Sequence, residues 1–103
     1  MEFEGYNEKI KEWTQGVLDN YRKDAELTIE YCDYLIAYGK RTGDARILGF
    51  AYHHLSGTLY CLNDGENIFD ITVKAIENLE KSSQWGLLAR SYNILGIVTF
   101  SRG

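Results

Sequence analysis

Two adjacent histidines, His53 and His54, are the residues of this chain best suited to hold a metal ion or transfer a proton. Neighbouring side chains on a helix point about 100° apart, whereas residues one turn apart lie on the same face and can share an ion. No Cys, carboxylate or further His completes a ligand set with them at helical spacing. The pattern therefore predicts no metal and no cofactor, with one histidine facing a groove and the other at a boundary between helices.

The sequence also lacks the residue patterns that are typical of disulfide bonds, phosphate binding and catalysis. The cysteines, Cys32 and Cys61, stand far apart in the sequence, and we interpret both as small buried hydrophobic residues rather than a disulfide. The sequence has no phosphate-binding glycine-rich loop, no nucleophile elbow and no paired carboxylates on an apolar face. We therefore expect that the chain is not an enzyme.

Charge and composition limit the partners. The 103 residues carry a net charge of −4, and no run of Lys and Arg follows one face, so we expect neither nucleic acid nor an anionic membrane as a partner. The first residues lack the basic start and apolar run of a signal peptide, and no segment has the length of a bilayer span. These features predict a cytoplasmic protein with a single domain over residues 1–103.

Apolar residues at spacings of three and four predict an all-α fold of about five helices. The chain has no proline, so helix ends are expected at Gly, Asn, Asp and Ser. A first helix is predicted over residues 4–22. Asp24, Asp44 and Asp64 are well placed to cap the next three helices, and Gly43 can end one of them.

Residues 24–63 and 64–103 repeat one another with a period of forty residues. Aligned without a gap, the two segments share six identities and place similar residues at several further positions. The identical pairs are Asp24/Asp64, Glu26/Glu66, Ile36/Ile76, Leu48/Leu88, Tyr52/Tyr92 and Leu55/Leu95. A repeated supersecondary unit of this length predicts a solenoid whose units bury their apolar faces on each other.

The pattern resembles the tetratricopeptide repeat over residues 24–103. The matching residues are Tyr52 and Tyr92 at the family's large position, Leu55-Ser56 and Leu95-Gly96 at its Leu-Gly position, Leu62-Asn63-Asp64 at its turn, and Ala75 at its small position. The resemblance implies a right-handed α-solenoid of antiparallel helix pairs. The sequence departs from the family in four ways: Ile68 stands where the family usually has a small residue, Leu35 replaces a late alanine, the frequent proline is missing, and the period exceeds the usual length of about thirty-four residues.

Long-helix repeats of this kind look most like the repeat regions of bacterial signalling and regulatory proteins, including those that precede diguanylate cyclase domains. The resemblance therefore implies a protein- or peptide-binding interaction or sensory module. It further implies that this module forms the N-terminal regulatory region of a larger signalling protein.

The resemblance also implies which residues face a ligand, because the family's A helices, which correspond to the first, third and fifth predicted helices of this chain, line the concave side of such a solenoid. The expected groove residues are Trp13, Phe50, His53, Tyr60, Arg90 and Asn93, with Gly57 and Ile97 beside them. Arginine suits a carboxylate, while aromatic rings supply anchoring area. The family's two-carboxylate clamp of lysine and asparagine is not reproduced, so a chaperone C-terminus is not the expected ligand.

Two alternatives to peptide binding stay open. The fifth helix ends the second repeat without a partner, and its edge of Leu95, Val98 and Phe100 is expected to be covered by a further helix of a longer chain or by a second copy. In the second case the repeat is a dimerisation scaffold. The other alternative is a small-ligand binder with a polar pocket around His53. Trp85 is interpreted as a packing residue between helices.

Overall fold

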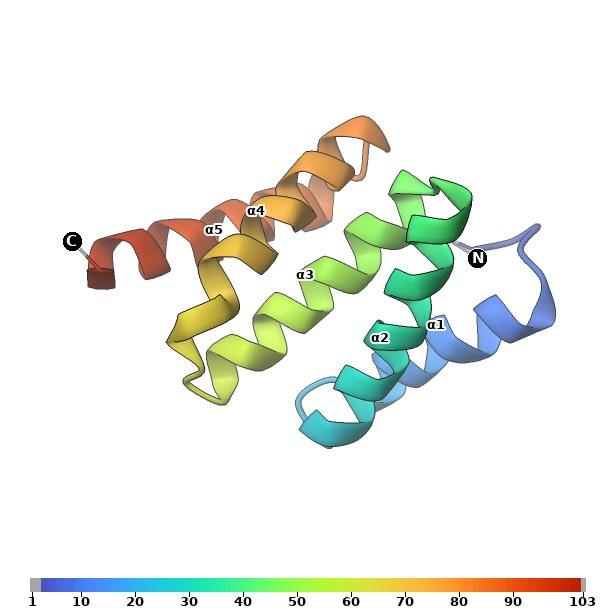
Figure 1. The fold of residues 1–103 in the computed structure, drawn as a ribbon, viewed down its shortest axis with the longest axis horizontal. Coiled ribbons are helices and arrows are strands. Elements are labelled where there is room, and N and C mark those ends of the chain that lie inside the picture. The colour runs from blue at the N-terminus through green and yellow to red at the C-terminus, as the bar shows by residue number, and fades with distance from the viewer. Residues whose placement is uncertain (1–2, 103) are drawn as a thin grey trace.

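The computed structural model describes residues 3–102, with side chains described through Phe100, and within this range it contains five α-helices and no strand (Figure 1). The all-α prediction is therefore confirmed. Each helix packs against the next one along the chain, and α3 also contacts α5. The helices are α1 (Glu8–Asn20), α2 (Ala25–Thr42), α3 (Ala45–Cys61), α4 (Gly65–Lys81) and α5 (Trp85–Arg102).

The period of forty residues arises from turns that recur every twenty. The residues immediately before α2, α3, α4 and α5 are Asp24, Asp44, Asp64 and Gln84. The carboxylates of Asp24 and Asp44 accept hydrogen bonds from the backbone N–H groups of Leu27 and Ile47, which satisfies a free donor at each helix start. Asp64 makes no such side-chain bond.

The residues just before three of these caps share a left-handed backbone conformation. Gly43, Asn63 and Ser83 have φ values of 70°, 60° and 58°. The next residue in each turn donates its backbone N–H to the carbonyl group five positions earlier, which ends the preceding helix in a Schellman-type turn. One helix with one turn thus occupies twenty residues, and the repeat read from the sequence consists of two such units.

The first helix is shorter than the predicted range of residues 4–22. Gly5 has a positive φ of 95°, and Asn7 caps the helix by accepting a hydrogen bond from the Ile10 backbone N–H. The helix ends at Asn20, and Arg22 adopts a left-handed φ of 70°. The segment before the helix turns inward, so that Phe3 is buried rather than helical.

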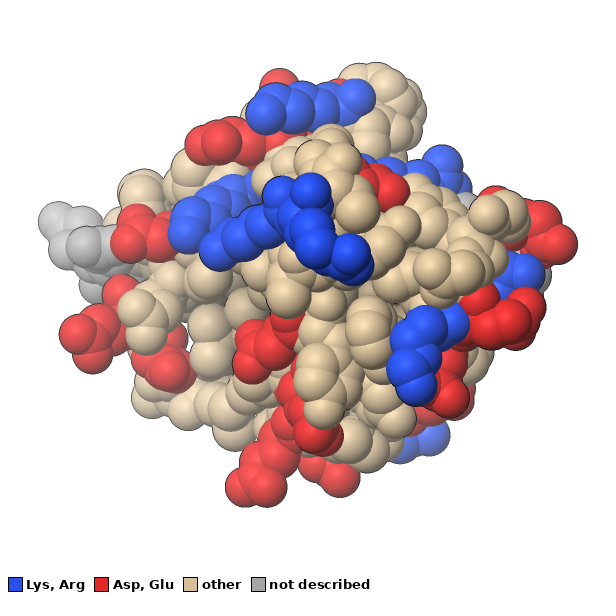
Figure 2. All heavy atoms as spheres, turned by 45° about the vertical axis from the view of Figure 1, so that its right-hand side comes forward, with Lys and Arg blue, Asp and Glu red and all other residues tan. Residues whose placement is uncertain are grey.

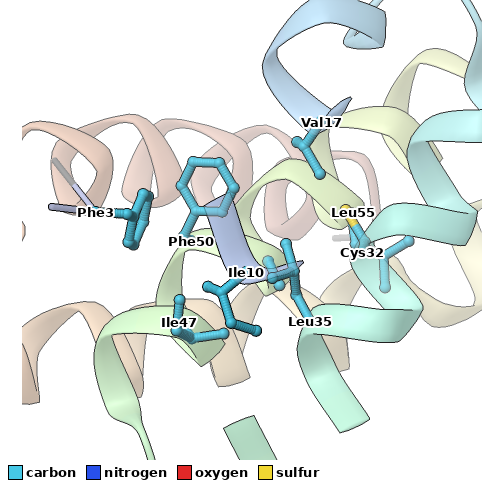
Figure 3. Close-up of a cluster of buried hydrophobic side chains, with 9 residues drawn as sticks. Phe3, Ile10, Val17, Cys32, Leu35, Ile47, Phe50 and Leu55 are labelled. Atoms are coloured by element: carbon cyan, nitrogen blue, oxygen red, sulfur yellow. The ribbon is translucent and has the colours of Figure 1, made fainter. Parts of the chain in front are cut away.

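The core has two parts that share α3. One part fills the space between α1, α2 and α3, as Figure 3 shows, and consists of Phe3, Ile10, Val17, Cys32, Leu35, Ile47, Phe50, Ala51 and Leu55. The other lies between α3, α4 and α5 and consists of Tyr52, Ala75, Ile76, Leu79 and Leu88. Because helices pack on both sides of α3, every residue from Gly49 to Thr58 is buried.

Charged side chains are unevenly spread over the surface. On the face drawn in Figure 2, Lys and Arg side chains gather near the middle, while Asp and Glu side chains lie mostly around the lower part and the two ends. A net charge of −4 therefore does not mean a uniformly acidic surface. The ligand preference of any site depends on its own lining.

Two glycines of the repeat provide a matched test of helix packing. A methyl group added at Gly49 would lie 2.8 Å from a methyl carbon of Leu79, which is itself fully buried, and 3.1 Å from the Leu79 backbone nitrogen. A methyl group at Gly96 would meet nothing within 4 Å. We expect Gly49→Ala to lower the free energy of unfolding by about 1–2 kcal/mol and Gly96→Ala to raise it by about 0.5–1 kcal/mol.

Urea unfolding followed by circular dichroism measures both changes. The packing described for α3 and α4 would be contradicted if Gly49→Ala stabilised the protein as much as Gly96→Ala does.

Candidate functional site

The largest hollow among those found in the described chain lies between the end of α1, the middle of α3 and α5, with a volume of about 510 Å³. Helix α3 forms part of its lining, while the end of α1, the α1–α2 turn and α5 contribute the rest. The lining residues are Leu18, Tyr21, Arg22, His53, His54, Gly57, Tyr60, Arg90, Asn93, Ile94 and Ile97. We call this hollow the α1/α3/α5 groove.

Four of the six residues expected to face a groove do line it. His53 and Tyr60 come from α3, and Arg90 and Asn93 come from α5. Tyr60, Arg90 and Asn93 are exposed, whereas His53 is buried. Residues His53 and Tyr60 of α3 thus lie in the same groove as Arg90 and Asn93 of α5.

The prediction that Phe50 faces the groove is wrong. Its side chain is only 1% exposed, and its ring packs edge-on against Phe3, with 4.9 Å between ring centroids. It also lies 4.4 Å from the ring of His54. The reason is the N-terminal segment, which folds back over α3 and covers the position that the repeat pattern leaves open.

Trp13 does not line the groove either. It is half-buried, and its ring packs against Tyr34 of α2 at 5.1 Å between centroids. The repeat alignment begins at residue 24, so it provides no register for α1. The placement of Trp13 in the groove is therefore an extrapolation beyond the repeat, and it is wrong.

One histidine bonds across the site to α5, and the other bonds within α3. His53 Nδ1 lies 2.7 Å from Ser91 Oγ, a buried hydrogen bond that joins α3 to α5. His54 Nδ1 lies 2.8 Å from the backbone oxygen of Phe50, and because a carbonyl oxygen only accepts, this nitrogen must carry the proton. A neutral His54 therefore has its lone pair on Nε2.

Both histidines are neutral at pH 7. The pKa of His53 is lowered to about 3, mainly by burial and also by His54 and the Arg90 guanidinium. Burial also lowers the pKa of His54 to about 4, although the Phe50 carbonyl opposes this shift. The floor of the groove thus carries no charge, so its electrostatic character depends on the arginines.

Several groove residues were not predicted from the sequence. Leu18, Tyr21 and Arg22 come from the end of α1 and the following turn, which lie outside the forty-residue repeat. Tyr21 packs edge-on against His54 and its hydroxyl group lies over Gly57, which has no side chain to obstruct it. The positive φ of Arg22 is not encoded by a glycine or asparagine, so no residue type in the sequence signals this turn.

The expected edge on α5 is only partly exposed. Phe100 is 88% exposed and Leu95 is half-buried, but Val98 is only 6% exposed. Val98 points toward the α3–α4 turn, where it lines a smaller cavity of about 140 Å³ with Leu59 and Ile68. Its assignment to an exposed edge is wrong, because Val98 faces residues at the end of α3 and the start of α4 instead of solvent.

Two residues that the sequence analysis placed in the interior, Trp85 and Cys61, are exposed instead. Trp85 is 62% exposed at the start of α5 and does not pack between helices. Cys61 is exposed at the end of α3, while Cys32 is buried as expected. In both cases a large or apolar residue stands at a helix end, where neighbouring helices no longer cover it.

No group of three or more His, Cys, Asp and Glu side chains within the described residues is arranged to hold a metal ion. None of the described helices is long and apolar enough to cross a membrane. The expectations of no cofactor and no catalysis stay predictions.

No known protein family, curated protein or solved structure matches this chain. The likeness to the tetratricopeptide repeat therefore rests on the residue pattern alone. What the site does has to be argued from its own geometry.

The buried histidines predict a specific acid sensitivity. Because folding lowers both pKa values below the unfolded value near 6.5, the unfolded chain binds more protons than the folded one as the pH falls. Stability from this source is complete above pH 6.5 and decreases toward pH 4. We expect a loss of about 2 kcal/mol per histidine between pH 7 and pH 5, measured by urea unfolding at both values.

The variants His53→Gln and His54→Gln separate this effect from the titration of carboxylates. Each should have a smaller difference in unfolding free energy between the two pH values than the parent. An unchanged difference in both variants would contradict the neutral, buried state of the pair.

Proposed function

We propose that this chain is an interaction module that binds a peptide segment of another protein in the α1/α3/α5 groove. The observation that carries the proposal is the groove itself, where four residues expected from the repeat pattern come together in an open hollow of about 510 Å³. Its lining combines exposed apolar area on Leu18, Tyr60 and Ile97 with polar groups on Arg90 and Asn93. Peptide-binding sites typically combine such anchors with a few oriented polar groups.

A small-ligand site around His53 has less support. The Nδ1 atom of His53 is already hydrogen-bonded to Ser91, and the side chain is buried and neutral at pH 7. The lowered pKa follows from burial between helices. The exposed residues of the groove are better placed to contact a ligand than the histidine.

The wider role remains part of the proposal. The likeness of the repeat to bacterial signalling proteins supports a regulatory region of a larger cytoplasmic protein, for example one ahead of a diguanylate cyclase domain. In that role, the bound segment would bias the packing of α5 against α3. The His53–Ser91 hydrogen bond lies at this contact.

Selection from a library of random dodecapeptides displayed on phage tests peptide binding even though the natural partner is not identified. We expect the parent to enrich a family of related peptides. For the best of them, Tyr60→Ala should weaken binding about tenfold, because it removes an exposed aromatic anchor of the groove.

Tyr34→Ala is the matched control. Tyr34 is exposed to a similar degree, 42% against 46%, but lies on α2 outside the groove. Its removal should change binding less than twofold. The proposal fails if no peptide family is enriched, or if the two variants weaken binding equally.

A second candidate, self-association through α5, is supported by comparing equivalent positions of the repeat. Gly49, Tyr52 and Ser56 on α3 are buried. Their equivalents on α5, Ala89, Tyr92 and Gly96, are all exposed. Together with Phe100 they form an apolar edge without a partner helix in the described chain, which is a typical surface for association.

Sedimentation velocity over a range of concentrations tests this edge. If the edge joins two copies, the parent should dimerise and Phe100→Ser should weaken the dimer about tenfold. Leu62→Ser, which removes another exposed apolar side chain at the α3–α4 turn, should have no such effect. A parent that stays monomeric at the highest concentration excludes the dimer.

A further inference from the structure

The lining of the α1/α3/α5 groove contains positive charge and no negative charge. Arg22 and Arg90 are its charged residues, and neither Asp nor Glu is among the residues that line it. This is unexpected in a chain with 15 acidic and 11 basic residues. The cause is visible in the sequence, because neither α3 nor α5 contains a single Asp or Glu.

The two arginines are available to a ligand. Neither of them forms an ion pair with another described side chain. Arg22 lies 5.4 Å from the centre of the Tyr21 ring, a cation–π contact that leaves its N–H donors open to a further partner. Arg90 is exposed, and no carboxylate within the described chain pairs with it.

The surroundings of the arginines make them more effective than isolated surface charges. The neutral imidazoles of His53 and His54 form part of the same lining and do not add a competing charge. Arg90 lines the groove together with both rings, and its charge contributes to their lowered pKa values. Concave sites lined by one sign of charge attract ligands of the opposite sign.

The remaining lining is largely apolar. Leu18, Ile94 and Ile97 surround the charged residues, and Asn93 adds an amide that can donate to or accept from a peptide group. A complementary ligand therefore carries a carboxylate and an apolar side chain close together. A purely basic or purely apolar segment would leave either the arginines or the apolar surface without a partner.

We infer that the segment bound in the groove is acidic, with the carboxylate of an Asp or Glu side chain paired to Arg90 and a neighbouring apolar side chain placed against Leu18 and Ile97. This inference rests on the proposed function and adds the chemical class of the ligand. Arginine pairs with carboxylates through two parallel N–H···O bonds, which gives direction as well as attraction.

The phage selection tests this inference directly. A peptide displayed at the N-terminus of a coat protein has no free carboxyl end, so any negative charge must come from Asp and Glu side chains. We expect the parent to enrich peptides with an Asp or Glu beside Leu, Ile, Val or Phe. The variant Arg90→Gln should lose the preference for acidic residues, while Arg41→Gln, an exposed arginine on α2 outside the groove, should retain it.

A double-mutant cycle then locates the contact. The best selected peptide and its Glu→Gln or Asp→Asn counterpart are titrated into the parent and into Arg90→Gln. Each single change should weaken binding at least fivefold, and the second change should add less than twofold once the first has been made. The two histidine ring signals in the NMR spectrum report the same titrations, because His53 and His54 are the only histidines of the chain and both line the groove.

The outcomes that contradict the inference are distinct. If no peptide is enriched, the proposed function fails and the inference with it. If the enriched peptides lack acidic residues, the groove binds peptides but the inference that they are acidic is wrong. The same holds if the losses of binding free energy from Arg90→Gln and from the peptide change are additive in the double-mutant cycle. If the acidic preference persists in Arg90→Gln while the histidine signals stay unmoved, the charge is recognised elsewhere and the inference is overturned.

Discussion

The enclosure of α3 is the constraint on which the rest of the structure depends. Its middle, from Gly49 to Thr58, is buried throughout, because α2 packs on one flank and α4 and α5 on the other, while apolar side chains of α1 complete the core beside it. Polar groups in such a helix cost free energy unless they are paired inside the protein. They are paired: Ser56 and Thr58 donate to backbone oxygens within the helix, while the two histidines bond to Ser91 and to a backbone carbonyl. The floor of the groove next to α3 is therefore made of buried, hydrogen-bonded side chains, and the exposed groups around it come from helix ends and from α5.

The distribution of acidic residues follows the same constraint. A helix buried between two neighbours cannot accommodate carboxylates without partners, and α3 has none. Helices α1, α2 and α4 each keep an exposed face, and acidic residues stand on those faces. Burial of α3 therefore accounts for the uncharged floor of the groove, whereas its positive charge comes from the exposed Arg22 and Arg90 and from the absence of Asp and Glu on α5.

The sequence predicted the parts of the fold that repeat. The caps at Asp24 and Asp44, the left-handed Gly43 and the register of His53 and Asn93 all follow from local rules applied twice along the chain. It did not predict the parts that occur once. The groove prediction fails at Phe50 because no local rule indicates that Phe3 folds over it, and it fails at Trp13 because α1 has no counterpart to fix its register. The third wall of the groove, Tyr21 and Arg22, depends on a turn whose positive φ falls on an arginine.

The regular twenty-residue spacing of the turns also has a kinetic consequence. Every extensive contact between described helices joins two helices that are consecutive in the sequence. The smaller contact between α3 and α5 joins helices that are separated by one other helix. Contacts between residues close in the sequence close only short loops, so little conformational entropy is lost before the stabilising contacts form. Proteins with mostly local contacts therefore fold quickly. The absence of proline removes the slow isomerisation that delays many other proteins. Among these five helices, each neighbouring pair can form its contacts soon after the second helix has been synthesised, and α5 gains its contacts after the other four.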